Sequence, residues 1–160
     1  MEFIKKIKSK EIAEKIANWE YNKPYDIYNM NGDENTIKEI IEDDYYSYIY
    51  NDIIIGYFCY GKPAIVPNDN SKDIYNDDKY LDIGIGMNPK LCGKGKGYSF
   101  FKKSVETAYE IYEIKKYRLT VAKFNKRAIK IYKKYGFLKD KEFVKNSSSS
   151  DTTFITMLYN

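Results

Sequence analysis

The sequence YLDIGIGMNPKLCGKGKGYSFF, residues 80–101, predicts a strand, a glycine-rich turn and the start of a helix. Apolar side chains alternate with polar residues or glycine up to Met87, and this period of two predicts a strand with one apolar face. Pro89 ends the strand, and an apolar pattern of helical period follows the turn. Within the turn, three glycines occupy alternate positions: Gly93, Gly95 and Gly97.

We expect this glycine turn, residues 92–97, to bind a phosphate group. A turn of this kind can direct several backbone N–H groups into one concavity, at the positive end of a helix dipole. Lys94 and Lys96 add positive charge. An exposed anion gains only about 0.3 to 1 kcal/mol from a helix N-terminus, so the N–H donors and both lysines must act together on a pyrophosphate. A flexible surface turn without a ligand is the alternative interpretation.

Two other nucleotide-binding motifs do not fit this spacing. The P-loop requires Ser or Thr directly after Gly-Lys, whereas Gly95 and Gly97 stand at those positions here. The dinucleotide fingerprint requires the spacing G-x-G-x-x-G directly after a strand in a βαβ unit, and the spacing here is G-x-G-x-G. The sequence therefore excludes both motifs.

The composition predicts one globular domain over residues 1–160. With 43% apolar and 31% charged residues, the chain has the composition of a soluble globular protein and enough apolar residues for a hydrophobic core. The net charge of +4 comes from basic and acidic residues scattered along the chain, so we expect no nucleic-acid partner. The absence of histidine removes the commonest metal ligand, and two cysteines cannot form a zinc site, so no metal is expected.

The cysteines and the hydropathy predict the compartment. Cys59 and Cys92 form no disulfide framework, and no signal peptide is recognisable, which favours the reducing cytoplasm. No run approaches the roughly 20 apolar residues that a membrane span requires, so no membrane partner is expected.

Residues 20–32 mix tyrosines with turn residues and have neither a helical nor a strand period. We expect an ordered loop there, in which Tyr21, Tyr25 and Tyr28 could line a substrate pocket. The alternative is that these tyrosines only pack at the rim, because the chain contains 18 tyrosines in 160 residues.

The rest of the chain predicts alternating strands and helices. Ser9 can cap an amphipathic helix, and Asn125 can cap another that ends at Gly136. Residues 61–79 are acidic and rich in asparagine, and we expect a solvated loop. A helix is expected over residues 34–43, and strands over residues 45–50, 53–60, 117–124, 137–144 and 152–159.

A second motif, NKRAIKIYKKYGF at residues 125–137, follows the glycine turn. In this order the two motifs resemble the GNAT superfamily of acyl-CoA N-acyltransferases. The family signature is a hydrophobic strand, a proline, then Gln or Arg, two residues, Gly, one residue, and Gly or Ala. Pro89, Gly95 and Gly97 match it, whereas Cys92 stands where Gln or Arg is usual.

The resemblance implies an α/β (α+β) fold. Its sheet is mixed but mostly antiparallel, has about seven strands splayed between the fourth and the fifth, and is flanked by about four helices. The resemblance also implies acetyl-CoA as acyl donor. The residues that would bind it are Ile85, Gly86, Met87, Cys92, Gly93, Lys94, Gly95, Lys96, Gly97, Tyr98, Asn125, Ala128 and Tyr132.

The implied reaction transfers the acetyl group to a primary amine of a small molecule or protein, by direct attack in a ternary complex. By resemblance Tyr132 donates the proton that the coenzyme A thiolate takes up on leaving, and an unperturbed tyrosine is protonated at neutral pH. Asp82 is the nearest carboxylate for a base, although solvent and backbone carbonyls could serve instead. The alternative function is a catalytically weak acyl-CoA-binding or regulatory module, and the sequence leaves monomer or homodimer open.

Overall fold

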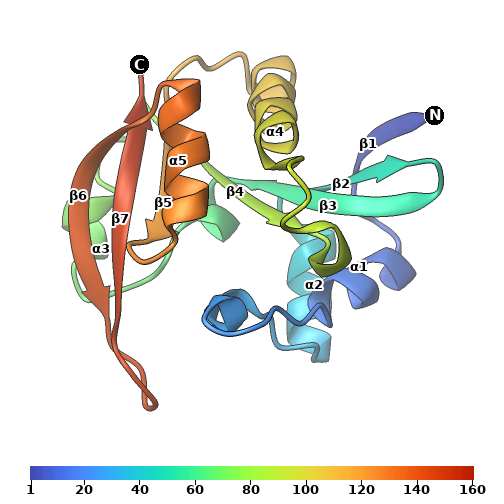
Figure 1. Cartoon of the computed structure of the whole chain (residues 1–160), viewed down its shortest axis with the longest axis horizontal. Helices are drawn as coiled ribbons and strands as arrows, with labels where there is room; N and C mark the ends of the chain where they lie inside the picture. Colours follow the sequence, from blue (N-terminus) through green and yellow to red (C-terminus); the bar gives the residue numbers. More distant parts are fainter. The chain divides into compact units, whose positions relative to one another are not determined.

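The computed structural model describes all 160 residues, which form seven strands and five α-helices (Figure 1). None of the helices combines the length and the apolar character that crossing a membrane requires. In chain order the elements are β1 Glu2–Lys6, α1 Lys10–Ala17, α2 Glu34–Glu42, β2 Tyr45–Tyr50, β3 Ile53–Tyr60, α3 Ser71–Ile74, β4 Leu81–Met87, α4 Gly97–Tyr112, β5 Tyr117–Ala122, α5 Lys126–Tyr135, β6 Leu138–Lys145 and β7 Thr152–Tyr159.

The seven strands form one sheet in the order β1-β2-β3-β4-β5-β7-β6. The pairs β1–β2, β2–β3, β5–β7 and β6–β7 are antiparallel, whereas β4 and β5 are parallel. The β4–β5 pairing consists of Leu81 with Tyr117 and Asp82 with Arg118 only, so the two strands pair only where they begin. The expected mixed, mostly antiparallel sheet that opens between its fourth and fifth strands is confirmed.

The chain forms two compact units, and β4 contributes to both. The first unit comprises Met1–Cys59 and Ile85–Lys96, and the second comprises Tyr60–Gly84 and Gly97–Asn160. The glycine turn therefore belongs to the first unit up to Lys96, and α4 begins the next part of the second unit.

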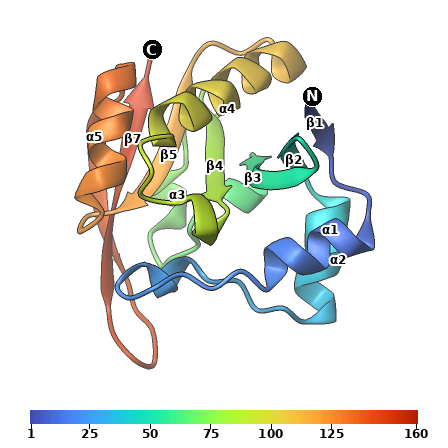
Figure 2. The ribbon, with the colours of Figure 1, turned by 45° about the vertical axis from the view of Figure 1, so that its right-hand side comes forward.

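In the first unit, α1 and α2 lie side by side on one face of β1, β2 and β3 (Figures 1 and 2). Each helix begins after a capping side chain: Ser9 accepts a hydrogen bond from the Ile12 N–H, and Asp33 accepts one from the Thr36 N–H. The apolar stripes of both helices are buried through Ala13, Ile16, Ala17, Ile37 and Ile40. This packing holds the loop between the two helices, residues 20–32, at both ends.

In the second unit, α5 lies along β7 (Figures 1 and 2). It also packs on α4, since the Tyr132 ring lies 4.7 Å from the Phe101 ring, centroid to centroid. Gly136 ends α5 with a φ of 125°, and a Cβ there would lie 3.0 Å from the Tyr159 ring. Glycine thus provides both the backbone conformation and the room that this helix end requires.

The segment 61–79 is more ordered than the expected solvated loop. It contains the one-turn helix α3, whose Ile74 is only 7% exposed. The Tyr75 hydroxyl lies 2.8 Å from the Thr120 hydroxyl and accepts a hydrogen bond from the Val66 N–H. The expectation was wrong in this respect, because buried Ile74 and half-buried Tyr75 fix a segment whose composition is otherwise that of a loop.

Candidate active site

The end of β4 is fixed to β3 by Asn88. Its backbone N–H donates to the Ile55 carbonyl at 2.8 Å, and its side-chain amide donates to the Ile54 carbonyl at 2.9 Å. The Asn88 side chain also accepts a hydrogen bond from the Lys90 N–H and so caps the short 3₁₀ helix Pro89–Leu91. The glycine turn therefore starts from a defined position.

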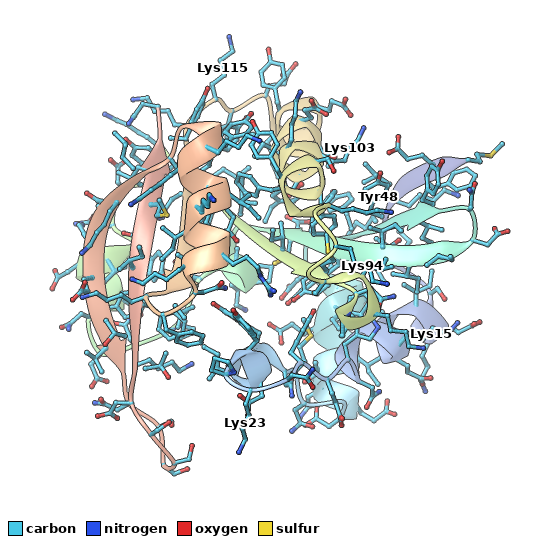
Figure 3. All side chains as sticks on the ribbon, viewed as in Figure 1. Lys15, Lys23, Tyr48, Lys94, Lys103 and Lys115 are labelled. Atoms are coloured by element: carbon cyan, nitrogen blue, oxygen red, sulfur yellow. The ribbon has the colours of Figure 1, made fainter.

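Gly93 and Gly95 have φ angles of 75° and 76°, in a region that other residues adopt at a cost. Lys94 lies between them, in the segment that connects β4 with α4 (Figure 3). A Cβ added at Gly95 would meet no atom within 4 Å. The backbone of the turn thus borders open space, as binding a pyrophosphate requires.

Cys92, which replaces the usual Gln or Arg, is directed back toward β4. Its sulfur lies 3.6 Å from the Asn88 carbonyl oxygen and 3.9 Å from that of Met87, within reach of weak hydrogen bonds. The thiol is half-buried. The side chain therefore helps to close the turn.

The structure brings Tyr21 to the end of β4. The Tyr21 hydroxyl donates a 2.7 Å hydrogen bond to the Met87 carbonyl, and burial raises the pKa of this tyrosine well above its ordinary value. Its backbone N–H donates to the Asn29 side chain and closes the loop 20–32. Tyr25 and Tyr28 lie in the same loop, half-buried on the 3₁₀ helix Tyr25–Tyr28.

Tyr57 on β3 is a residue that the sequence analysis missed. A Cβ at Gly86 would lie 2.1 Å from the Tyr57 Cε1 and 2.7 Å from its hydroxyl oxygen, so the ring lies directly against the β4 backbone. The Tyr57 ring is also 6.3 Å from the Trp19 ring and 5.7 Å from the Tyr45 ring. The only signal in the sequence was Gly86, a glycine within a strand, which indicates that another group approaches the backbone closely. The sequence does not show that this group is the Tyr57 ring.

In the second unit, Gly97 is the first residue of α4. A Cβ there would lie 2.7 Å from the Cδ1 of Ile131, so glycine allows α4 to begin close to α5. The next residue, Tyr98, has the Lys134 ammonium over its ring at 4.2 Å from the centroid. Both contacts fix the N-terminus of α4 against α5.

Asn125 caps α5, as expected. Its side-chain oxygen accepts a 3.2 Å hydrogen bond from the Ala128 N–H, and the residue is 8% exposed. Tyr132 lies seven residues further on, which at about 100° per residue puts it on nearly the same side of the helix, roughly 10 Å along the axis. Its ring is half-buried against Phe101, so packing and catalysis are both compatible with its position.

Asp82 forms a buried ion pair. Both of its carboxylate oxygens accept 2.7 Å hydrogen bonds from the Arg118 guanidinium, and the two residues are 8% and 4% exposed. Arg118 also donates to the Asp77 carbonyl and lies over the Tyr75 ring. Burial raises the pKa of the Asp82 carboxyl, although the hydrogen bonds and charge of Arg118 oppose this. This geometry favours a structural role where β4 and β5 pair, and the catalytic role stays an untested prediction.

The model of the Acetyltransferase (GNAT) family matches residues 11–137. This range includes the glycine turn and the motif at residues 125–137. A search of curated proteins gives no match.

Solved acetyltransferases have the same fold. A ribosomal-protein-alanine N-acetyltransferase from Brucella melitensis is 14% identical, with a TM-score of 0.72 over 98% of each chain. Mutant forms of a spermidine/spermine N-acetyltransferase from Vibrio cholerae are 14% identical, with a TM-score of 0.69 over 99% of this chain and 94% of that one. A Salmonella typhimurium protein named yncA, solved with its cofactor acetyl-CoA, is 14% identical, with a TM-score of 0.66 over 99% of this chain and 92% of that one.

Proposed function

Because the chain belongs to the acetyltransferase (GNAT) family, we propose that it is an acetyl-CoA-dependent N-acetyltransferase. The acceptor is a primary amine of a small molecule or a protein, which attacks the acetyl group directly in a ternary complex. The observation that supports this most is the glycine turn, with two positive φ angles and open space at Gly95. We further propose that residues 1–160 act as one acyltransferase domain, while a cytoplasmic location stays a prediction from the sequence.

The turn is proposed to hold the pyrophosphate of the cofactor. Its backbone N–H groups and those at the start of α4 donate hydrogen bonds, and Lys94 and Lys96 supply charge. The full set of turn residues in this role is Cys92, Gly93, Lys94, Gly95, Lys96, Gly97 and Tyr98. Bound acetyl-CoA supplies an activated thioester, and the chain's part is to hold and orient it.

The backbone of Ile85, Gly86 and Met87 is proposed to pair with the amides of the pantetheine arm, as an added strand would. The Met87 carbonyl already accepts from Tyr21, but a carbonyl oxygen has two lone pairs and can accept a second hydrogen bond. Asn125, Ala128 and Tyr132 would contact the same arm from α5.

Tyr132 is proposed as the general acid that protonates the departing thiolate. The acceptor must lose a proton to attack, and we assign this to water and backbone carbonyls. Asp82 is not assigned this role, because Arg118 engages both of its oxygens. Tyr132 thus distinguishes an enzyme from a module that only binds the cofactor.

The test is Tyr132→Phe, which keeps the ring packing on Phe101 and removes the hydroxyl. We expect kcat to fall, with a loss of about 10² to 10⁴-fold as the ceiling, and the affinity for acetyl-CoA to change little. Tyr135→Phe is the matched control, because Tyr135 also packs on Phe101, 5.6 Å away. Full activity in Tyr132→Phe would show that Tyr132 is a packing residue and not the general acid, whereas a wild type without measurable turnover would favour the alternative, a weakly catalytic acyl-CoA-binding module.

A further inference from the structure

Tyr57 is held in a defined position in the first unit. Its ring contacts the Trp19 and Tyr45 rings, and its edge lies against the backbone of Gly86. Burial raises the pKa of Tyr57 well above its ordinary value, so the hydroxyl stays protonated at neutral pH and cannot serve as a base. Its position and its protonation state are therefore both fixed by the surrounding residues.

The Tyr57 hydroxyl takes part in none of the structure's hydrogen bonds, unlike those of Tyr21 and Tyr48, which bind Met87 and Glu2. The residue is half-buried, so part of it stays accessible. A hydroxyl group has one donor hydrogen and two acceptor lone pairs. Tyr57 thus presents an unused polar group in largely aromatic surroundings, next to the β4 backbone assigned to the acyl donor.

We propose that the Tyr57 hydroxyl hydrogen-bonds the acceptor amine, and that Trp19 and Tyr45 complete a site for a primary amine carried on an apolar body. This inference rests on the proposed function. The Tyr57 oxygen accepts an N–H of the neutral amine, which leaves the nitrogen lone pair to form the new bond to the acetyl carbon. Tyr57 is therefore a positioning residue for the acceptor.

The surroundings select the class of amine. The desolvation that raises the pKa of a tyrosine lowers that of an ammonium group, and so favours the neutral amine that the reaction needs. A polyamine would bring further charges. The groups that act on the Tyr57 hydroxyl include no carboxylate, although Glu39 and Asp43 act on Tyr45, and the rings that contact Tyr57 suit an apolar body. An aromatic or aliphatic monoamine fits better.

Trp19 provides a direct reporter, because it is the only tryptophan in the chain and its ring stacks on Tyr57. The full chain, saturated with coenzyme A, is titrated with phenethylamine and with spermidine while tryptophan emission is followed. The variant is Tyr57→Phe, which keeps the ring. The control is Tyr48→Phe, which loses a hydroxyl at the labelled position in Figure 3, where it binds Glu2. Acceptor KM and the affinity for acetyl-CoA are measured in parallel.

We expect phenethylamine to change the emission saturably in wild type and in Tyr48→Phe. In Tyr57→Phe its apparent Kd and KM should rise about 3- to 10-fold, as for one lost hydrogen bond, with unchanged affinity for acetyl-CoA. Equal phenethylamine binding by wild type and Tyr57→Phe, or tighter binding of spermidine than of phenethylamine, would overturn the inference. A wild-type chain that fails to bind acetyl-CoA would instead refute the proposed function, and the amine titration without cofactor would still decide the role of Tyr57.

Discussion

Replacing Asp82 with Asn should destabilise the fold strongly, through Arg118. Breaking a buried ion pair leaves an uncompensated charge, at a typical cost of about 3 to 5 kcal/mol. Arg118 keeps the Asp77 carbonyl and the Tyr75 ring, and the new amide oxygen can still accept one hydrogen bond, worth about 1 kcal/mol. We therefore expect Asp82→Asn to lower the free energy of unfolding by about 2 to 4 kcal/mol, and Tm by about 5 to 15 °C.

The assay is urea and thermal unfolding of the variant and two controls. Asp78→Asn removes a nearby exposed carboxylate and should change the stability by less than about 0.5 kcal/mol. The double variant Asp82→Asn with Arg118→Met removes the stranded charge and should be more stable than Asp82→Asn alone. A stability of Asp82→Asn within about 0.5 kcal/mol of wild type would show that the Asp82–Arg118 pair does not stabilise the fold. If activity were nevertheless lost, a catalytic role of Asp82 would have to be reconsidered.

Three further predictions concern the glycine turn and Tyr48 on β2. Gly95→Val forces a β-branched residue into positive φ and fills the open space, so calorimetry should show a weakened affinity for coenzyme A; a folded variant with wild-type affinity would place the site elsewhere. Bound coenzyme A should slow alkylation of Cys92, and equal rates with and without cofactor would contradict this. Partial burial and the hydrogen bond to Glu2 raise the pKa of Tyr48 to about 12. The stability that the protonated hydroxyl contributes is therefore fully present below the ordinary tyrosine pKa and is lost as the pH rises through about 12. Alkaline difference titration against Tyr48→Phe should show this late ionisation, and Glu2→Gln should lower the pKa.

Much of the fold could be predicted because its signals are local. The caps of α1 and α5 were expected at Ser9 and Asn125, and the structure has both. Strands were expected over residues 45–50 and 53–60, and the two residues between them, Asn51 and Asp52, have positive φ, as in a tight type I′ hairpin turn. Each of these features depends on a few consecutive residues, so single-chain patterns suffice.

The contacts of β4 could not be predicted, because they depend on which strands become its neighbours. The alternation in β4 suggested one apolar face, yet Asp82 and Gly86 on the other face are buried as well. Arg118 covers Asp82 and Tyr57 lies against Gly86, and both partners come from other strands. Such pairings depend on the register of the sheet, which no local pattern encodes.

The most direct test of the proposed function is amine-dependent release of coenzyme A thiol from acetyl-CoA by the purified chain. The amines to be screened are small monoamines, polyamines, aminoglycosides and peptides. We expect saturable thiol release with at least one of them, matched mole for mole by the acetylated amine. Tight binding of acetyl-CoA with no amine raising thiol release above the uncatalysed rate would contradict the enzymatic function and leave a cofactor-binding module.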